Sequence, residues 1–166
     1  MSSVEAMKRL IAPLVLVVVV VLALVLTAGG GNEPERVPDS SLPRLDGGEP
    51  FALASLAEAE EPTLLWFWAP WCTVCNGEAP KIERLASELD VVAIGGRDDA
   101  ANGPAFVERH DLRTPAIVFD EPMAVWEAYA IPGQPAGVLL DREGRERARW
   151  LGAFDPAAVV AAARAL

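Results

Sequence analysis

Continuous apolar runs alternate along this chain with segments of helical periodicity. Residues 63–68 (TLLWFW) are apolar throughout, which predicts a central strand buried on both faces. Residues 91–94 form a second such run. Between the two runs, apolar side chains recur at the spacing of one helix face, at Ile82, Leu85, Ala86 and Leu89. The pattern therefore predicts two strands joined by a helix.

Shorter patterns complete the predicted fold. Further short strands are expected at residues 51–53, 116–119, 137–140 and 146–150, and short helices at 55–59, 105–110 and 123–129. The DREG sequence at residues 141–144 predicts a hairpin turn, and Asp155 followed by Pro156 predicts the start of a last helix. The order β-α-β-α followed by β-β-α predicts an α/β fold, a mixed central sheet flanked by helices.

The N-terminal segment has a different character. Residues 10–28 contain no charged residue and follow Lys8 and Arg9. At about 1.5 Å per residue this run just covers a hydrocarbon core of about 30 Å. We predict a transmembrane anchor that leaves residues 1–9 in the cytoplasm and carries the rest of the chain across the membrane. A cleaved signal peptide is the alternative, because small residues at 27–29 suit a peptidase.

Either alternative places the remaining chain outside the cytoplasm, at the cell membrane as a single-pass protein or secreted if cleaved. Residues 29–41 are predicted as a linker and residues 42–166 as one domain, whose length suits a single core. The net charge of −10 opposes binding to phosphate backbones. We therefore exclude nucleic acid as a partner.

The chain has two cysteines, Cys72 and Cys75, placed directly after the first predicted strand. Their spacing puts both on one face of a helical turn and permits a disulfide between them. The helix N-terminus favours a thiolate over a thiol. Because Cys72 lies nearest that end, it is the candidate nucleophile, and Cys75 would resolve the mixed disulfide.

Two other uses of the pair compete with redox exchange. A metal site normally needs about four ligands, and the chain adds only His110, which we expect at the surface or as a charge at a helix C-terminus. A purely structural disulfide across so short a loop would constrain the unfolded chain little. Redox exchange is therefore favoured, and no metal or organic cofactor is expected.

The sequence FWAPWCTVC, residues 67–75, resembles the thioredoxin-fold signature FWAxWCxxC. The flanking features resemble the TlpA/ResA/DsbE-like branch of membrane-anchored or secreted thiol-disulfide oxidoreductases. The similarity runs from residue 42 to residue 166 and includes YAIPGQPAGVLLDREGR at residues 129–145. It implies a thioredoxin-like fold that exchanges disulfides with protein substrates.

The same resemblance implies roles for individual residues. Pro135 matches the cis-proline that packs against the CxxC, and Gln134 and Ala136 beside it match substrate-binding positions. Glu78 matches an acid/base residue near the second cysteine, with an ordinary first-turn helix acid as the alternative. Trp71 is expected to shield the disulfide and offer substrates an apolar surface, with ordinary packing as its alternative.

Two departures from the family pattern stand out. Ala136 replaces the usual threonine after the cis-proline, and Trp66 stands where thioredoxin has a buried aspartate. The charged loop GGRDDAANG at residues 95–103 could contact a partner, although such loops are commonly only solvated.

The resemblance thus implies an extracytoplasmic enzyme, expected to be a monomer, that acts on protein thiols and disulfides. A membrane electron carrier is a candidate redox partner. The direction stays open between reduction for cytochrome c maturation, as in ResA-like proteins, and oxidation of exported proteins, as in DsbE-like proteins. The stretches FWFWAPWC and GGRDDAA favour oxidation. A non-enzymatic copper- or protein-binding module on the same fold is the alternative from another class.

Overall fold

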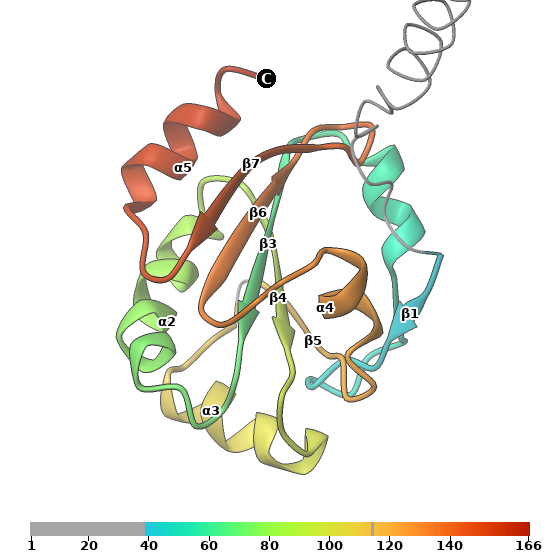
Figure 1. Ribbon diagram of the computed structural model, residues 1–166, viewed down its shortest axis with the longest axis vertical. Helices are drawn as coiled ribbons and strands as arrows, with labels where there is room; N and C mark the ends of the chain where they lie inside the picture. Colours follow the sequence, from blue (N-terminus) through green and yellow to red (C-terminus); the bar gives the residue numbers. More distant parts are fainter. Residues whose placement is uncertain (1–38, 114) are drawn as a thin grey trace, which may run out of the picture. The chain divides into compact units, whose positions relative to one another are not determined.

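A five-stranded mixed sheet forms the centre of the computed structural model, which describes residues 39–113 and 115–166 (Figure 1). The strand order is β5-β4-β3-β6-β7. The central strand β3 runs parallel to β4 and antiparallel to β6, and β5 and β7 form the two edges. The strands are β3 (Thr63–Trp68), β4 (Asp90–Gly95), β5 (Ala116–Phe119), β6 (Ala136–Leu140) and β7 (Glu146–Leu151). The predicted mixed sheet is therefore confirmed.

Helices cover both faces of this sheet (Figure 1). One face carries α2 (Thr73–Leu85), α3 (Gly103–Arg109) and α5 (Pro156–Ala163), with the 3₁₀ turn η2 (Ala100–Asn102) leading into α3. The other face carries α4 (Ala124–Ala128), the 3₁₀ helix η1 (Leu53–Glu58) and the small hairpin of β1 (Ser41–Leu42) and β2 (Phe51–Ala52). Each helical layer closes its own apolar core against the sheet.

Side chains of β3 enter the two cores alternately. Leu64, Trp66 and Trp68 pack beneath α2 and α3, whereas Leu65 and Phe67 pack beneath α4 and η1. All six residues of the strand are buried. This burial on both faces explains why the sequence of the strand is apolar throughout and does not alternate with polar residues.

The structure also limits and corrects the predictions at the N-terminal side. The predicted cytoplasmic residues 1–9, the anchor at 10–28 and all but the end of the linker lie outside the described residues. Within residues 39–113 and 115–166, no helix is both long enough and apolar enough to cross a membrane. Strand β1 was not predicted, and it begins at Ser41, the last residue of the predicted linker.

Asp120 is a fully buried carboxylate between β5 and α4. Its Oδ1 accepts a hydrogen bond from the backbone N–H of Ala124 at 3.1 Å, and its Oδ2 accepts from Val125 at 2.8 Å and Trp126 at 3.0 Å. These N–H groups open α4 and have no partner within the helix. One buried carboxylate therefore satisfies the whole start of this short helix and fixes it against the sheet.

Replacing Asp120 with alanine leaves the buried N–H groups of Val125 and Trp126 without their acceptor. We expect the free energy of unfolding to fall by about 1–3 kcal/mol, as measured by urea denaturation followed by tryptophan fluorescence. Glu127→Ala, at an exposed position of the same helix, is the control and should change stability by no more than about 0.5 kcal/mol. Equal losses in the two variants would contradict the capping role of Asp120.

Candidate active site

The strand register brings four segments to one end of the sheet. Trp68, the last residue of β3, pairs with Gly95 at the end of β4, and Phe67 pairs with Ala136 at the start of β6. Ala136 in turn pairs with Leu151, the last residue of β7. Four segments therefore meet at the same end of the sheet: the segment after β3, the loop after β4, the residues before β6 and the end of β7. Parallel strands commonly place their functional residues at this end.

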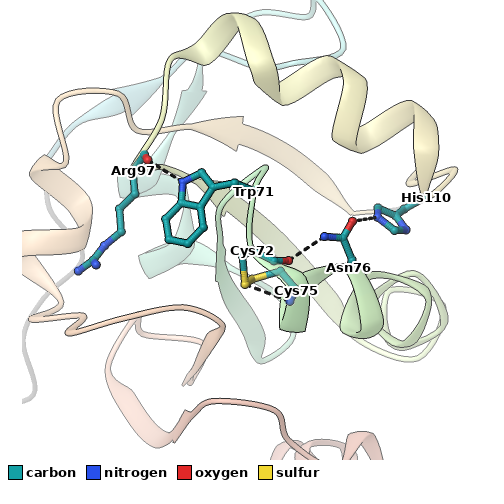
Figure 2. Close-up of a disulfide and its surroundings, with 6 residues drawn as sticks. All are labelled: Trp71, Cys72, Cys75, Asn76, Arg97 and His110. Atoms are coloured by element: carbon teal, nitrogen blue, oxygen red, sulfur yellow. Dashed lines mark hydrogen bonds between the residues drawn. A yellow bond between two sulfur atoms is a disulfide. The ribbon is translucent and has the colours of Figure 1, made fainter.

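Cys72 and Cys75 form a disulfide at this end of the sheet, with their Cα atoms 5.2 Å apart (Figure 2). Cys72 is the N-cap of α2, and its sulfur accepts a hydrogen bond from the backbone N–H of Cys75 at 3.1 Å. Cys72 is 5% exposed and Cys75 is fully buried. An attacking sulfur therefore reaches Cys72, and the helix N-terminus is already aimed at that sulfur.

Trp71 stands beside the disulfide with 58% of its surface exposed. Its indole Nε1 donates to the carbonyl oxygen of Arg97 at 3.0 Å, which ties the ring to the loop after β4 (Figure 2). Two other large apolar side chains at this end of the sheet are also exposed, Val74 at 50% and Leu151 at 59%. Exposed apolar side chains thus share one end of the sheet with the disulfide, and one of them is held in place by a hydrogen bond.

Arg97 shapes the surface next to Trp71. Its Nη2 donates to the carbonyl oxygen of Pro132 at 2.9 Å, and its guanidinium lies 5.3 Å from the ring centroid of Trp126. Together with Met123 these residues line an open cavity of about 720 Å³. The predicted charged loop is therefore partly structural, because its arginine is committed to an aromatic ring and a backbone carbonyl.

Asn76 and His110 extend the site and were missed as functional candidates. Asn76 Nδ2 donates to the Cys72 carbonyl oxygen at 2.8 Å, and its Oδ1 lies 2.7 Å from His110 Nε2 (Figure 2). His110 is the C-cap of α3 and its ring packs 4.6 Å from Phe106. The predicted place of His110 at a helix C-terminus is therefore confirmed, and the structure adds that its ring is half-buried and hydrogen-bonded.

The peptide bond between Gln134 and Pro135 is cis, as the family resemblance implied. Gln134 is half-buried, and its Oε1 has no hydrogen-bond partner among the described residues. Ala136 is fully buried between β3 and β7. The side chain of Ala136 is therefore not accessible, and its assignment as a substrate-binding residue stays a prediction.

Glu78 lies one turn after Cys75 in α2 and is only 2% exposed. Its Oε1 accepts from the backbone N–H of Phe154 at 3.3 Å and from Lys81 Nζ at 3.5 Å, while its Oε2 has no partner within the described part of the chain. The residue lies beyond the first turn of the helix, so the alternative of an ordinary first-turn acid does not describe it. Its acid/base role stays a prediction.

No group of three or more metal-ligating side chains within residues 39–113 and 115–166 is arranged to hold a metal ion.

Comparisons with known proteins find a family model that matches this chain and several similar proteins. The model of the AhpC/TSA family matches residues 34–160. The soluble secreted antigen MPT53 of Mycobacterium tuberculosis is 36% identical over 100 residues, which cover 58% of this chain and 56% of the relative. The chain thus matches little more than half the length of that relative.

Two solved structures share the fold. MTB DsbF, solved in mixed oxidized and reduced forms, is 30% identical with a TM-score of 0.69, covering 78% of this chain and 98% of the other. A secreted Mycobacterium tuberculosis disulfide oxidoreductase homologous to E. coli DsbE is also 30% identical, with a TM-score of 0.66 and coverage of 77% and 96%. The predicted thioredoxin-like α/β fold is confirmed.

Partial burial lowers the pKa of His110 from its ordinary value of 6.5, and the charge of Arg109 lowers it further. As pH falls below 6.5 the unfolded chain takes up this proton before the folded chain does, so stability from this group is present above that pH and is lost on acidification. NMR titration of the imidazole, the only one in the chain, should give a midpoint below that of the urea-unfolded protein. A midpoint at or above the unfolded value would contradict this expectation.

Proposed function

Because this chain belongs to the AhpC/TSA family, we propose that it is a thiol-disulfide oxidoreductase that exchanges disulfides with proteins through Cys72 and Cys75. The observation that carries this proposal is the disulfide at the start of α2, where the Cys72 sulfur receives the N–H of Cys75. A sulfur in that position is reachable, and its thiolate is stabilised as a leaving group.

Oxidation of a substrate then runs in two exchanges. A substrate thiolate attacks the Cys72 sulfur, which forms a mixed disulfide and releases the Cys75 sulfur as a thiolate. The second substrate thiol then attacks the substrate sulfur that is bonded to Cys72 in the mixed disulfide. This step releases Cys72 as a thiolate and leaves a disulfide in the substrate. Two electrons and two protons pass to the cysteine pair. Reduction of a substrate is the same sequence in reverse, with Cys72 as nucleophile and Cys75 as resolving thiol.

The buried carboxylate of Glu78 is the candidate to exchange a proton with Cys75. Both residues lie on one face of α2, and Glu78 Oε2 has no partner among the described residues. A carboxylate in this position could take the proton that leaves Cys75 when that thiol becomes a nucleophile. The backbone N–H of Phe154 donates to Glu78 Oε1 and so orients the carboxyl group.

The substrate class follows from the surface around the disulfide. Trp71, Val74 and Leu151 are exposed apolar side chains at the same end of the sheet as the disulfide. Exposed apolar clusters commonly mark sites of protein contact. An extended or unfolded polypeptide can cover such side chains while it brings its own cysteine to Cys72. Gln134, beside the cis-proline, is a candidate contact for its backbone.

We favour oxidation of exported proteins as the direction. The N–H donor and helix N-terminus at Cys72 stabilise the thiolate, which favours the reduced pair and makes the disulfide a stronger oxidant. The similarity to a secreted disulfide oxidoreductase homologous to DsbE supports an exported site of action. The apolar segment at residues 10–28 would hold this monomer at the membrane, where an electron carrier could reoxidise it.

The cysteine variants test the order of attack. Cys72→Ser removes the accessible sulfur, so disulfide exchange should fall to the uncatalysed rate. Cys75→Ser removes the resolving thiol, so mixed disulfides with substrate proteins should accumulate and be visible on a non-reducing gel. The double variant is the control and should form none. Adducts that persist in Cys72→Ser would show that Cys75 is the attacking sulfur instead.

The direction is tested by equilibrating the full-length protein in glutathione buffers and measuring its reduction potential. An oxidant should lie nearer to about −120 mV, and a reductant nearer to about −270 mV. In parallel, the oxidised protein should form disulfides in a reduced, unfolded substrate faster than the reduced protein cleaves insulin disulfides. A potential near the lower value, with rapid insulin reduction, would replace the proposed direction by its reverse.

A further inference from the structure

The side chain of Asn76 connects the turn that holds Cys72 to His110, which is 34 positions away in the sequence. The carbonyl oxygen of Cys72 accepts two hydrogen bonds from Asn76, one from its backbone N–H at 3.1 Å and one from its Nδ2 at 2.8 Å. On the far side of the amide, Asn76 Oδ1 lies 2.7 Å from His110 Nε2 (Figure 2). A continuous path of hydrogen bonds thus runs from α3 to the residue that carries the reacting sulfur.

Donor and acceptor roles along this path fix one another. The carbonyl of Cys72 can only accept, so the amide group that faces it must be Nδ2. Asn76 Oδ1 then faces the imidazole and accepts, which places a hydrogen on His110 Nε2. An amide turned the other way would set its oxygen against the carbonyl oxygen of Cys72 and lose the bond to Cys72. The Cys72 carbonyl therefore selects the orientation of the Asn76 amide, and His110, as the Nε2–H tautomer, holds the amide in that orientation.

Aromatic packing holds His110 in place. Its ring centroid lies 4.6 Å from that of Phe106, which stacks at 4.3 Å on Trp68, the last residue of β3. Phe106 and Trp68 are both buried in the core beneath α2 and α3. The imidazole donor is thus positioned by the core and needs little further ordering to serve Asn76.

We propose that Asn76 and His110 are positioning residues that stabilise the reduced form of the Cys72–Cys75 pair by holding a second N–H donor on the Cys72 carbonyl oxygen. This inference rests on the proposed thiol-disulfide exchange. The carbonyl oxygen carries partial negative charge in the same residue as the thiolate, and an N–H donor aimed at it offsets that charge. The same bond holds the first turn of α2, so that the N–H of Cys75 stays directed at the Cys72 sulfur.

The reduced state gains more from this arrangement than the disulfide does. A disulfide sulfur is neutral, whereas the Cys72 thiolate is an anion that feels both the carbonyl dipole and the Cys75 N–H. Loss of the relay should therefore leave the Cys72 thiolate less stable and make the pair harder to reduce. One hydrogen bond of this kind corresponds to about a threefold to tenfold change in an equilibrium constant.

A matched pair of His110 variants in the full-length protein separates this role from packing. His110→Phe keeps a ring against Phe106 and removes the N–H donor, whereas His110→Gln keeps an N–H donor for Asn76 Oδ1. For the phenylalanine variant, the equilibrium constant for reduction by glutathione should fall about threefold to tenfold. That is about 14–30 mV at 29.6 mV per tenfold. The glutamine variant should stay within about twofold of the wild type.

Asn76→Ala tests the same relay from its other end and does not disturb the aromatic core. Its equilibrium constant should shift in the same direction as that of His110→Phe. The double variant should shift no further than either single one, because both remove the same interaction. Glu108→Gln, at an exposed position of α3, controls for a change of charge on that helix and should leave the constant unchanged.

Each result decides between the two proposals. If the wild-type pair fails to equilibrate with glutathione, the proposed function is overturned and this inference with it. If the wild type equilibrates but His110→Phe and Asn76→Ala keep its constant, the relay alone is overturned. Equal shifts in the phenylalanine and glutamine variants would likewise assign His110 to packing. Shifts in both His110→Phe and Asn76→Ala, with rescue by glutamine, support the relay.

Discussion

The hydrogen bond from the backbone N–H of Cys75 to the sulfur of Cys72 depends on where α2 begins, and only residues 69–72 separate α2 from the end of β3. Strand β3 is buried on both faces and pairs with β4 on one side and β6 on the other. A strand held in this way cannot shift without moving both cores. The fixed end of β3 therefore sets the position of the cysteine turn relative to the loops that surround it.

The polar groups around the disulfide are mostly engaged within the protein. Arg97 donates to a backbone carbonyl and lies over Trp126, Asn76 bridges to His110, and the indole of Trp71 is bonded to the loop after β4. These bonds order side chains that would otherwise lose conformational freedom when a substrate binds. The site is thus preorganised by contacts that lie outside the cysteine pair itself.

Much of this fold was predictable because its strongest signals are local. The apolar run at residues 63–68 can only be a buried element, and the cap formed by Asp155 and Pro156 begins α5 as predicted. Strand β1 has two residues, which are too few to show the alternation of apolar and polar side chains that marks a strand. Its pairing with β2 therefore could not be predicted from the sequence.

The contact between Asn76 and His110 could not be predicted for a different reason. It joins residues from two helices that only the packing of Phe106 on Trp68 brings together. The same limit applies to the burial of Ala136, which depends on its pairing with both neighbouring strands. A position beside Cys75 and a single histidine in the chain were the only sequence signals that could have drawn attention to Asn76 and His110.

The acidity of the chain contrasts with the character of the site. The net charge is −10, yet the surface nearest the disulfide presents Trp71, Val74 and Leu151, and the nearby arginine is already committed to a backbone carbonyl and an aromatic ring. Glu127 lines the cavity beside Trp71 and is exposed, so the charge at this end of the sheet is negative, like that of the chain, and does not attract an acidic substrate. Apolar contact and an accessible cysteine, features common to many unfolded chains, are then the properties that a substrate must offer. This breadth agrees with the proposed exchange with protein thiols and disulfides.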